Sequence, residues 1–114
     1  MSTAAERLAT VQENYDQAAD NQAKDLAKAK DEVEVAAVQA NVGAARLAYY
    51  KAEADELSKA GADVEQAQQE AKDALAAVKK ARQDVEKLAT LLGKLSKATE
   101  KAANLVEKAK KAIG

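Results

Sequence analysis

Residues 57–64 read LSKAGADV and divide the sequence into two halves of similar pattern. Gly61 suits the left-handed position that follows a helix. Asp63 suits the N-cap that precedes one, because its side chain can accept from a backbone N–H of the first turn. The segment Ala60–Asp63 therefore predicts the end of one helix and the start of the next. A connection this short predicts that the two helices are antiparallel neighbours.

Apolar or small residues recur every three and four positions on both sides of this connection, as in paired helices. Before it, the larger members of this seam are Leu8, Tyr15, Leu26, Val33, Leu47, Tyr50 and Leu57. After it, they are Val64, Val78, Val85, Leu88, Leu92, Leu95, Val106 and Ile113. Alanine fills most of the other seam positions, and Gly43 is expected to pack closely against Val78.

The pattern predicts an all-α fold, a single domain that is a long antiparallel two-helix coiled-coil hairpin. Helix one spans about residues 3–60 and begins with a capping box between Thr3 and Glu6. Helix two spans about residues 63–113, so each arm is ~75–85 Å long at 1.5 Å per residue. Two polar seam residues, Gln22 and Thr99, are expected to share a layer. They either fix the alignment of the arms or are simply tolerated in a weakly buried seam.

A seam this rich in alanine buries little apolar surface, so the hairpin needs further cover. Two additional apolar stripes are candidates for it, one in the middle of helix one and one near the open end of the hairpin. The interface residues on them are Val35, Val38, Val42, Tyr49, Val11, Leu91 and Leu105. Tyr49 is expected to project outward, whereas Tyr50 belongs to the seam. These stripes predict that hairpins assemble into a four-helix bundle or larger oligomer.

Composition argues against catalysis and against a bound cofactor or metal. The sequence contains no His or Cys, the usual nucleophiles, bases and soft-metal ligands. It also lacks glycine-rich phosphate loops and the EF-hand spacing. Carboxylates such as Asp31, Glu32 and Glu34 are interpreted as solvated surface, because neighbours on a helix point in different directions. We therefore expect no enzyme activity, cofactor or metal site.

Charge is unevenly distributed along the chain. Residues 1–35 carry eight acidic and four basic side chains, whereas residues 88–114 carry two acidic and six basic ones. Opposite fields favour antiparallel pairing of the two ends, modestly because exposed pairs are screened. The basic set has no aromatic platform and faces these acids, so nucleic-acid binding is not indicated.

These features predict a non-enzymatic structural or assembly protein, a self-associating coiled-coil rod that mediates protein–protein contacts as a homo-oligomer. One alternative is an adaptor or chaperone that binds a different helical protein through the same stripes. The other is an amphipathic protein that coats a lipid or storage-polymer surface with its lysine-rich residues 88–113. The sequence has neither a run of about 18 apolar residues nor a secretory-signal pattern. A cytosolic location is the default expectation, with signal-independent export left open.

Overall fold

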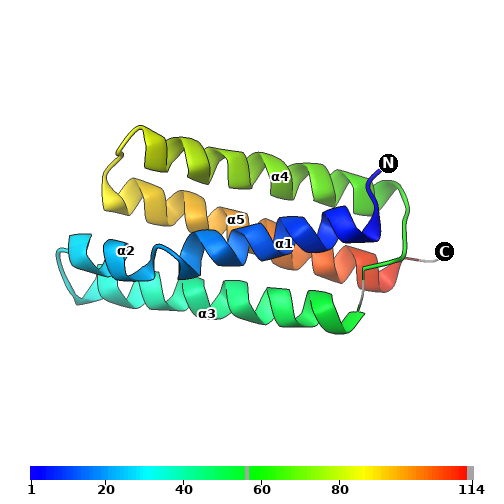
Figure 1. The fold of residues 1–114 in the computed structure, drawn as a ribbon, viewed down its shortest axis with the longest axis horizontal. Helices are drawn as coiled ribbons and strands as arrows, with labels where there is room; N and C mark the ends of the chain where they lie inside the picture. Colours follow the sequence, from blue (N-terminus) through cyan, green and yellow to red (C-terminus); the bar gives the residue numbers. More distant parts are fainter. Residues whose placement is uncertain (56, 113–114) are drawn as a thin grey trace.

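The computed structural model describes residues 1–55 and 57–112, and this part of the chain is all-helical. Its helices are α1 (Ala4–Ala19), α2 (Gln22–Lys28), α3 (Glu32–Asp55), α4 (Ala62–Gln83) and α5 (Leu88–Lys111). α2 continues the path of α1 after a short break, so α1 and α2 act as one arm (Figure 1). A single chain thus forms a four-helix bundle with dimensions of 47 × 24 × 18 Å.

The bundle consists of two antiparallel hairpins that lie side by side. The α1–α2 arm pairs with α3 in the first hairpin, and α4 pairs with α5 in the second (Figure 1). α3 also packs on α5, and α1 also packs on α4 and α5. The consecutive helices α3 and α4 lie diagonally opposite each other. The connection between them therefore crosses one end of the bundle.

The prediction of two unbroken helices, at residues 3–60 and 63–113, is wrong. The chain also turns at residues 29–31 and 84–87, and α1 separates from α2 at residues 20–21. The predicted end of helix two at residue 113 lies outside the described residues. The all-α class is confirmed, but each arm is about half as long as expected.

Side-chain caps explain why the chain turns before α3. The backbone N–H of Glu34 donates to Asp31 Oδ1 at 2.9 Å, and the backbone N–H of Lys30 donates to Glu34 Oε1 at 2.8 Å. These bonds satisfy N–H groups that have no partner inside a helix. The Asp31-x-x-Glu34 spacing is a helix-start signal that the continuous apolar periodicity concealed.

The break between α1 and α2 has a similar local cause. Asp20 and Asn21 are weak helix formers whose side chains compete for backbone partners. The Asn21 Nδ2 group donates to the carbonyl of Gln17 at 2.9 Å. The interruption thus lies where two such residues are adjacent.

The turn between α4 and α5 is a Schellman motif with an unusual residue in its left-handed position. The backbone N–H of Glu86 donates to the Ala81 carbonyl at 3.1 Å, and that of Val85 donates to the Arg82 carbonyl at 3.3 Å. Val85 has φ 52° and is 76% exposed. A β-branched side chain is strained in this conformation, by about 1–2 kcal/mol.

Replacing Val85 with Gly is expected to stabilise the protein by about 0.5–1 kcal/mol. Relief of the backbone strain exceeds the ~0.4–1 kcal/mol of extra chain entropy that glycine gives the unfolded state. Urea unfolding followed by circular dichroism measures the change. Val85→Ala is the matched control, and it should gain less because it keeps its Cβ. A less stable glycine variant would contradict the strained geometry.

The predicted turn at Ala60–Asp63 falls in the right place, between α3 and α4, but its geometry differs. Gly61 is extended, with φ 160°, and is the N-cap of α4. The left-handed residue is Leu57, with φ 48°, and its side chain is buried at the end of the core. The Arg7 Nη1 group donates to the Leu57 carbonyl at 2.7 Å. This bond anchors the diagonal connection to α1.

The predicted capping box at the N-terminus is confirmed. The backbone N–H of Glu6 donates to Thr3 Oγ1, and that of Thr3 donates to Glu6 Oε1, both at 3.1 Å. The adjacent Ser2 donates to the carboxylate of Glu65 on α4, and these bonds hold the pKa of Glu65 below its ordinary value. A lowered carboxyl pKa means that this contact stabilises the fold at neutral pH and weakens as the pH falls through that pKa.

The core comprises two clusters of aliphatic side chains, one toward each end of the bundle. Val11, Val64, Leu105 and Val106 lie in the first cluster. Val38, Val42, Val78, Leu91 and Leu95 lie in the second. Part of the predicted seam is therefore core, but its members Val33, Leu47, Tyr50 and Val85 are exposed.

Candidate functional site

The residues predicted to join copies of the chain pack against helices of the same chain. Val11 and Leu105 are fully buried in the first core cluster, whereas Val38, Val42 and Leu91 are buried in the second. Their apolar surface is already covered. The sequence predicts that a second copy buries these residues, whereas helices of the same chain bury them.

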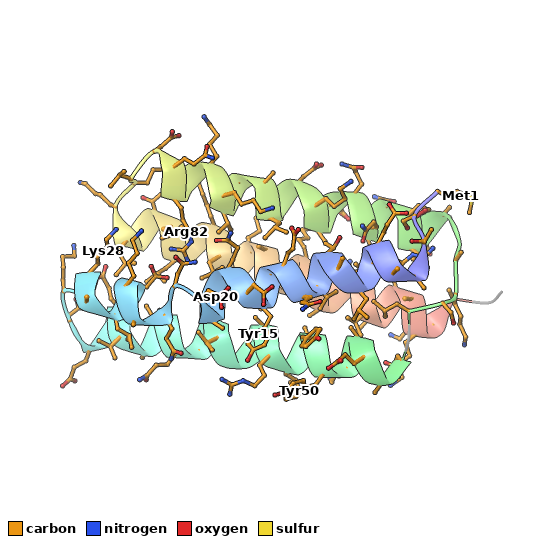
Figure 2. All side chains as sticks on the ribbon, in the orientation of Figure 1. Met1, Tyr15, Asp20, Lys28, Tyr50 and Arg82 are labelled. Atoms are coloured by element: carbon orange, nitrogen blue, oxygen red, sulfur yellow. The ribbon has the colours of Figure 1, made fainter. Side chains whose placement is uncertain are left out.

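The two other residues of that set, Val35 and Tyr49, are half-buried. The Tyr49 ring stacks on Tyr15 of α1, with centroids 5.7 Å apart and planes at 23°. Removal from water, followed by the nearby Glu53 carboxylate, raises the pKa of the Tyr49 hydroxyl. Tyr49 therefore packs α3 against α1, and the prediction that it projects outward is wrong. Figure 2 shows that Tyr50 is the tyrosine at the outer edge of the bundle.

The solvent side of α3 carries a continuous apolar stripe, here called the α3 outer face. All of its members are exposed and are spaced by three and four residues: Val33, Ala36, Ala40, Gly43, Leu47, Tyr50 and Ala54. Leu47 and Tyr50 are each 56% exposed. Single exposed apolar residues are ordinary, but an aligned stripe along a whole helix is typical of an interaction surface.

Charge is nearly absent from the middle of this face. No charged residue occurs between Val35 and Ala45. The next residue, Arg46, is held toward α1: its Nε donates to the Tyr15 hydroxyl at 3.3 Å, and its guanidinium lies 5.9 Å from the centre of that ring. The central part of the α3 outer face therefore presents little charge to an approaching surface.

Gly43 lies in the centre of the α3 outer face and has no packing role inside the bundle. It is exposed, and a Cβ atom added to it would meet nothing within 4 Å. The prediction that Gly43 packs closely against Val78 is wrong, because Gly43 is on the solvent side of α3 whereas Val78 is buried in the core. A glycine inside a helix costs about 1 kcal/mol relative to alanine. No contact within an isolated bundle offsets this cost.

A shallow groove of about 540 Å³ runs beside this face, between α3 and α5. Small side chains such as Ala44, Ala48 and Ala103 form much of its lining, and Leu47 also lines it. The groove widens the apolar surface around Leu47. Its shape and lining suit a packed helix better than a small polar ligand.

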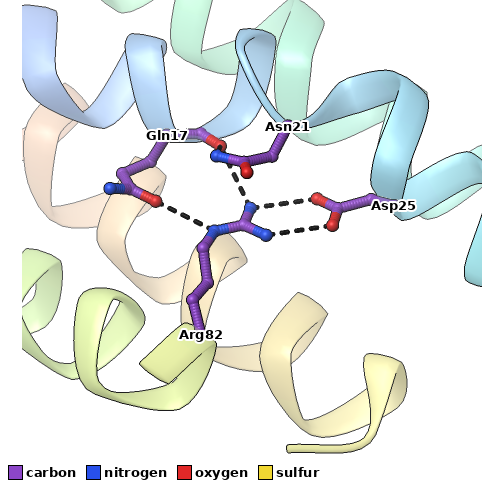
Figure 3. Close-up of polar contacts among 4 residues, drawn as sticks. All are labelled: Gln17, Asn21, Asp25 and Arg82. Atoms are coloured by element: carbon purple, nitrogen blue, oxygen red, sulfur yellow. Dashed lines mark hydrogen bonds and ion pairs between the residues drawn. The ribbon is translucent and has the colours of Figure 1, made fainter. Parts of the chain in front are cut away.

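Charged groups in the interior have structural partners. Arg82 reaches from α4 to the break between α1 and α2, where it makes two 2.9 Å bonds to the carboxylate of Asp25 (Figure 3). It also donates to the Gln17 carbonyl at 3.0 Å and to Gln17 Oε1 at 2.9 Å. This cluster holds the broken arm against α4.

Thr99 is part of the buried polar interior, but its partner differs from the predicted one. Asn14 Nδ2 donates to Thr99 Oγ1 at 3.2 Å, whereas Gln22 is half-buried in α2. A second internal pair joins Gln68 to Thr10 at 2.9 Å. The expected polar layer therefore exists across α1 and α5, with Asn14 in place of Gln22.

Among the described residues, the two ion pairs made by acids of the first arm go to α4, not to the basic residues of α5 as expected. Glu13 pairs with Lys79 at 3.0 Å, and Asp25 pairs with Arg82. Within residues 1–55 and 57–112, no group of three or more acidic side chains converges as a metal site would require. None of the helices in the same ranges is long and apolar enough to cross a membrane.

Comparison of the chain with protein-family models, curated proteins and solved structures gives no match.

Proposed function

We propose that this protein is a non-enzymatic structural or assembly element, a four-helix bundle that associates with copies of itself. The observation that carries the proposal is the α3 outer face. It is an apolar stripe along one side of a helix whose opposite side is already in the core. A helix apolar on two opposite sides is typical of one that lies between two neighbours.

The non-enzymatic part of the proposal is supported by how the buried charges are used. Both oxygens of the Asp25 carboxylate are bonded to Arg82, and Glu34 accepts from a backbone N–H. Arg7 donates to backbone carbonyls and to Ser2. Each of these buried groups has a structural partner, whereas a catalytic acid or base must be free to reach a substrate.

The size of the α3 outer face supports reversible association. α3 has 24 residues and is therefore ~36 Å long at 1.5 Å per residue. At a helix spacing of about 10 Å, the face covers on the order of 360 Å² per copy. This is less than half of the roughly 800 Å² per partner in a standard stable interface. The contact thus belongs to the weak class, which forms at high local concentration.

The test is light scattering of the pure protein over a series of concentrations from micromolar to millimolar. We expect the mean mass to rise from one chain toward two. Leu47→Asp should weaken this association at least tenfold, because it places a charge in the apolar contact. Val85→Asp is the matched control: it removes an even more exposed aliphatic residue outside α3 and should not change the mass. A parent protein that stays monomeric throughout would overturn the proposal and favour the adaptor alternative.

A further inference from the structure

We propose that two copies dock α3 against α3 in antiparallel orientation, with Leu47 of each copy packed over Gly43 of the other. This inference rests on the proposed self-association and specifies its partner, orientation and register. The two-fold axis that relates the two copies crosses the contact at the level of residue 45. The contact then runs from Ala36 to Ala54 on each copy, and Val33 lies beyond it.

Side-chain size favours this arrangement. The larger residues of the α3 outer face, Leu47 and Tyr50, lie in one half of the contact, and the smallest, Ala40 and Gly43, lie in the other. An antiparallel pair places Leu47 over Gly43 and Tyr50 over Ala40, so large residues meet small ones twice around the axis. A parallel pair would instead set Leu47 on Leu47 and leave an unfilled gap between the two glycines.

Gly43 gives an independent reason for close approach at this position. It is exposed, and the space around its missing Cβ is open within the bundle. Glycine at the centre of an apolar helix face allows another helix to pack closely, and it makes room for a large side chain from the partner. A second copy would give Gly43 a packing role that it lacks in the isolated bundle.

Charge is compatible with the same orientation and register. Charged residues flank the contact, and each lies beside the flanking residue on the same side of the other copy. At the proposed register Glu53 lies beside Gln39 and Lys51 lies beside Ala37, so neither meets a like charge. Arg46 faces its own counterpart near the axis, but each guanidinium is drawn aside onto Tyr15.

The competing arrangements bring more like charges together. Sliding the copies by one heptad places Val33 over Tyr50 and sets Glu32 against Glu53 at both ends. A parallel pair sets Arg46 against Lys51 on both sides. Like charges facing each other disfavour these two arrangements. Sliding by one heptad in the opposite direction is disfavoured by side-chain size, because it sets Leu47 on Tyr50.

Cross-linking of single-cysteine variants tests the geometry directly, because the chain has no cysteine of its own. Ala36→Cys and Ala54→Cys change exposed alanines and should leave the fold intact. In the proposed dimer, residue 36 of one copy faces residue 54 of the other. Two residues 36 are ~27 Å apart, as are two residues 54, at 1.5 Å per residue. A short bifunctional thiol reagent should therefore link the mixed variants and leave each single variant unlinked.

Each other pattern overturns the inference in an identifiable way. Linkage within the single variants and none in the mixture would show a parallel pair. Linkage of mixed Val33→Cys and Tyr50→Cys, but not of Ala36→Cys with Ala54→Cys, would show the register shifted by one heptad. Light scattering of the same samples separates these results from failure of self-association. A dimeric mass without any linkage would place the interface outside α3, whereas a monomeric mass would overturn the proposed function as well.

Discussion

Replacing Arg82 with Ala is expected to destabilise the bundle by about 3–5 kcal/mol. The Asp25 side chain is 1% exposed and that of Arg82 is 12% exposed, so their ion pair is largely shielded from water. Removing one partner of such a pair leaves the other charge buried without compensation. The same substitution removes two further bonds to Gln17, which hold the end of α1 beside the break. A typical domain has only about 5–15 kcal/mol of stability, so this loss is large.

The measurement is urea unfolding of Arg82→Ala, followed by circular dichroism. Lys79→Ala is the matched control on the same helix, because its ion pair with Glu13 is about half exposed and should contribute less than ~1 kcal/mol. The double variant Asp25→Leu/Arg82→Leu should be more stable than Arg82→Ala, since no unpaired charge remains. An Arg82→Ala variant as stable as Lys79→Ala would show that the pair does not hold the broken arm.

The helical class, the capping box at Thr3 and the position of the central connection can all be predicted from the sequence. These follow from local signals: helix-forming composition, a side-chain cap and a glycine between two apolar runs. The additional turns also had local signals, at Asp20–Asn21 and at Asp31. The unbroken apolar periodicity nevertheless predicts one continuous helix through these positions. Side-chain caps of this kind decide where such a periodic segment is divided into separate helices.

The turn at Val85 could not be inferred in the same way. A β-branched residue is unfavourable in the left-handed conformation, so nothing in the local sequence marks it as the end of a helix. Tertiary packing overrides the preference: α4 and α5 bury their apolar sides against each other only if the chain reverses there. The gain from burying these two helices exceeds a strain of about 1–2 kcal/mol.

The interface prediction exchanged the inner and outer sides of α3. Both sides carry apolar residues at helical spacing, and alanine fills both, so the pattern alone does not tell which side faces the core. Val38 and Val42 on one side are buried, whereas Leu47 and Tyr50 on the other are exposed. The helices that pack against α3 determine which of its sides faces the core. The stacking of Tyr49 on Tyr15 and the packing of α5 fix the rotation of the helix.

This exchange leads to an opposite pair of expectations for two leucines. Leu105→Ala should destabilise the bundle by about 2–5 kcal/mol, because Leu105 is fully buried and its truncation leaves a cavity. Leu47→Ala should change stability by no more than about 0.5 kcal/mol, because the side chain is exposed. Unfolding is measured by urea at concentrations where light scattering shows a monomer, so that association does not contribute to either value.

The same pair distinguishes a core made by one chain from a core made by two hairpins. If the stripe through Leu105 joined separate copies, Leu105→Ala would lower the mass of the particle and make its unfolding midpoint depend on protein concentration. In the single-chain bundle, Leu105→Ala lowers the midpoint equally at all concentrations, and only Leu47→Ala weakens association. Because both substitutions delete the same atoms from the same residue type, the difference between them reports the location of the side chain alone.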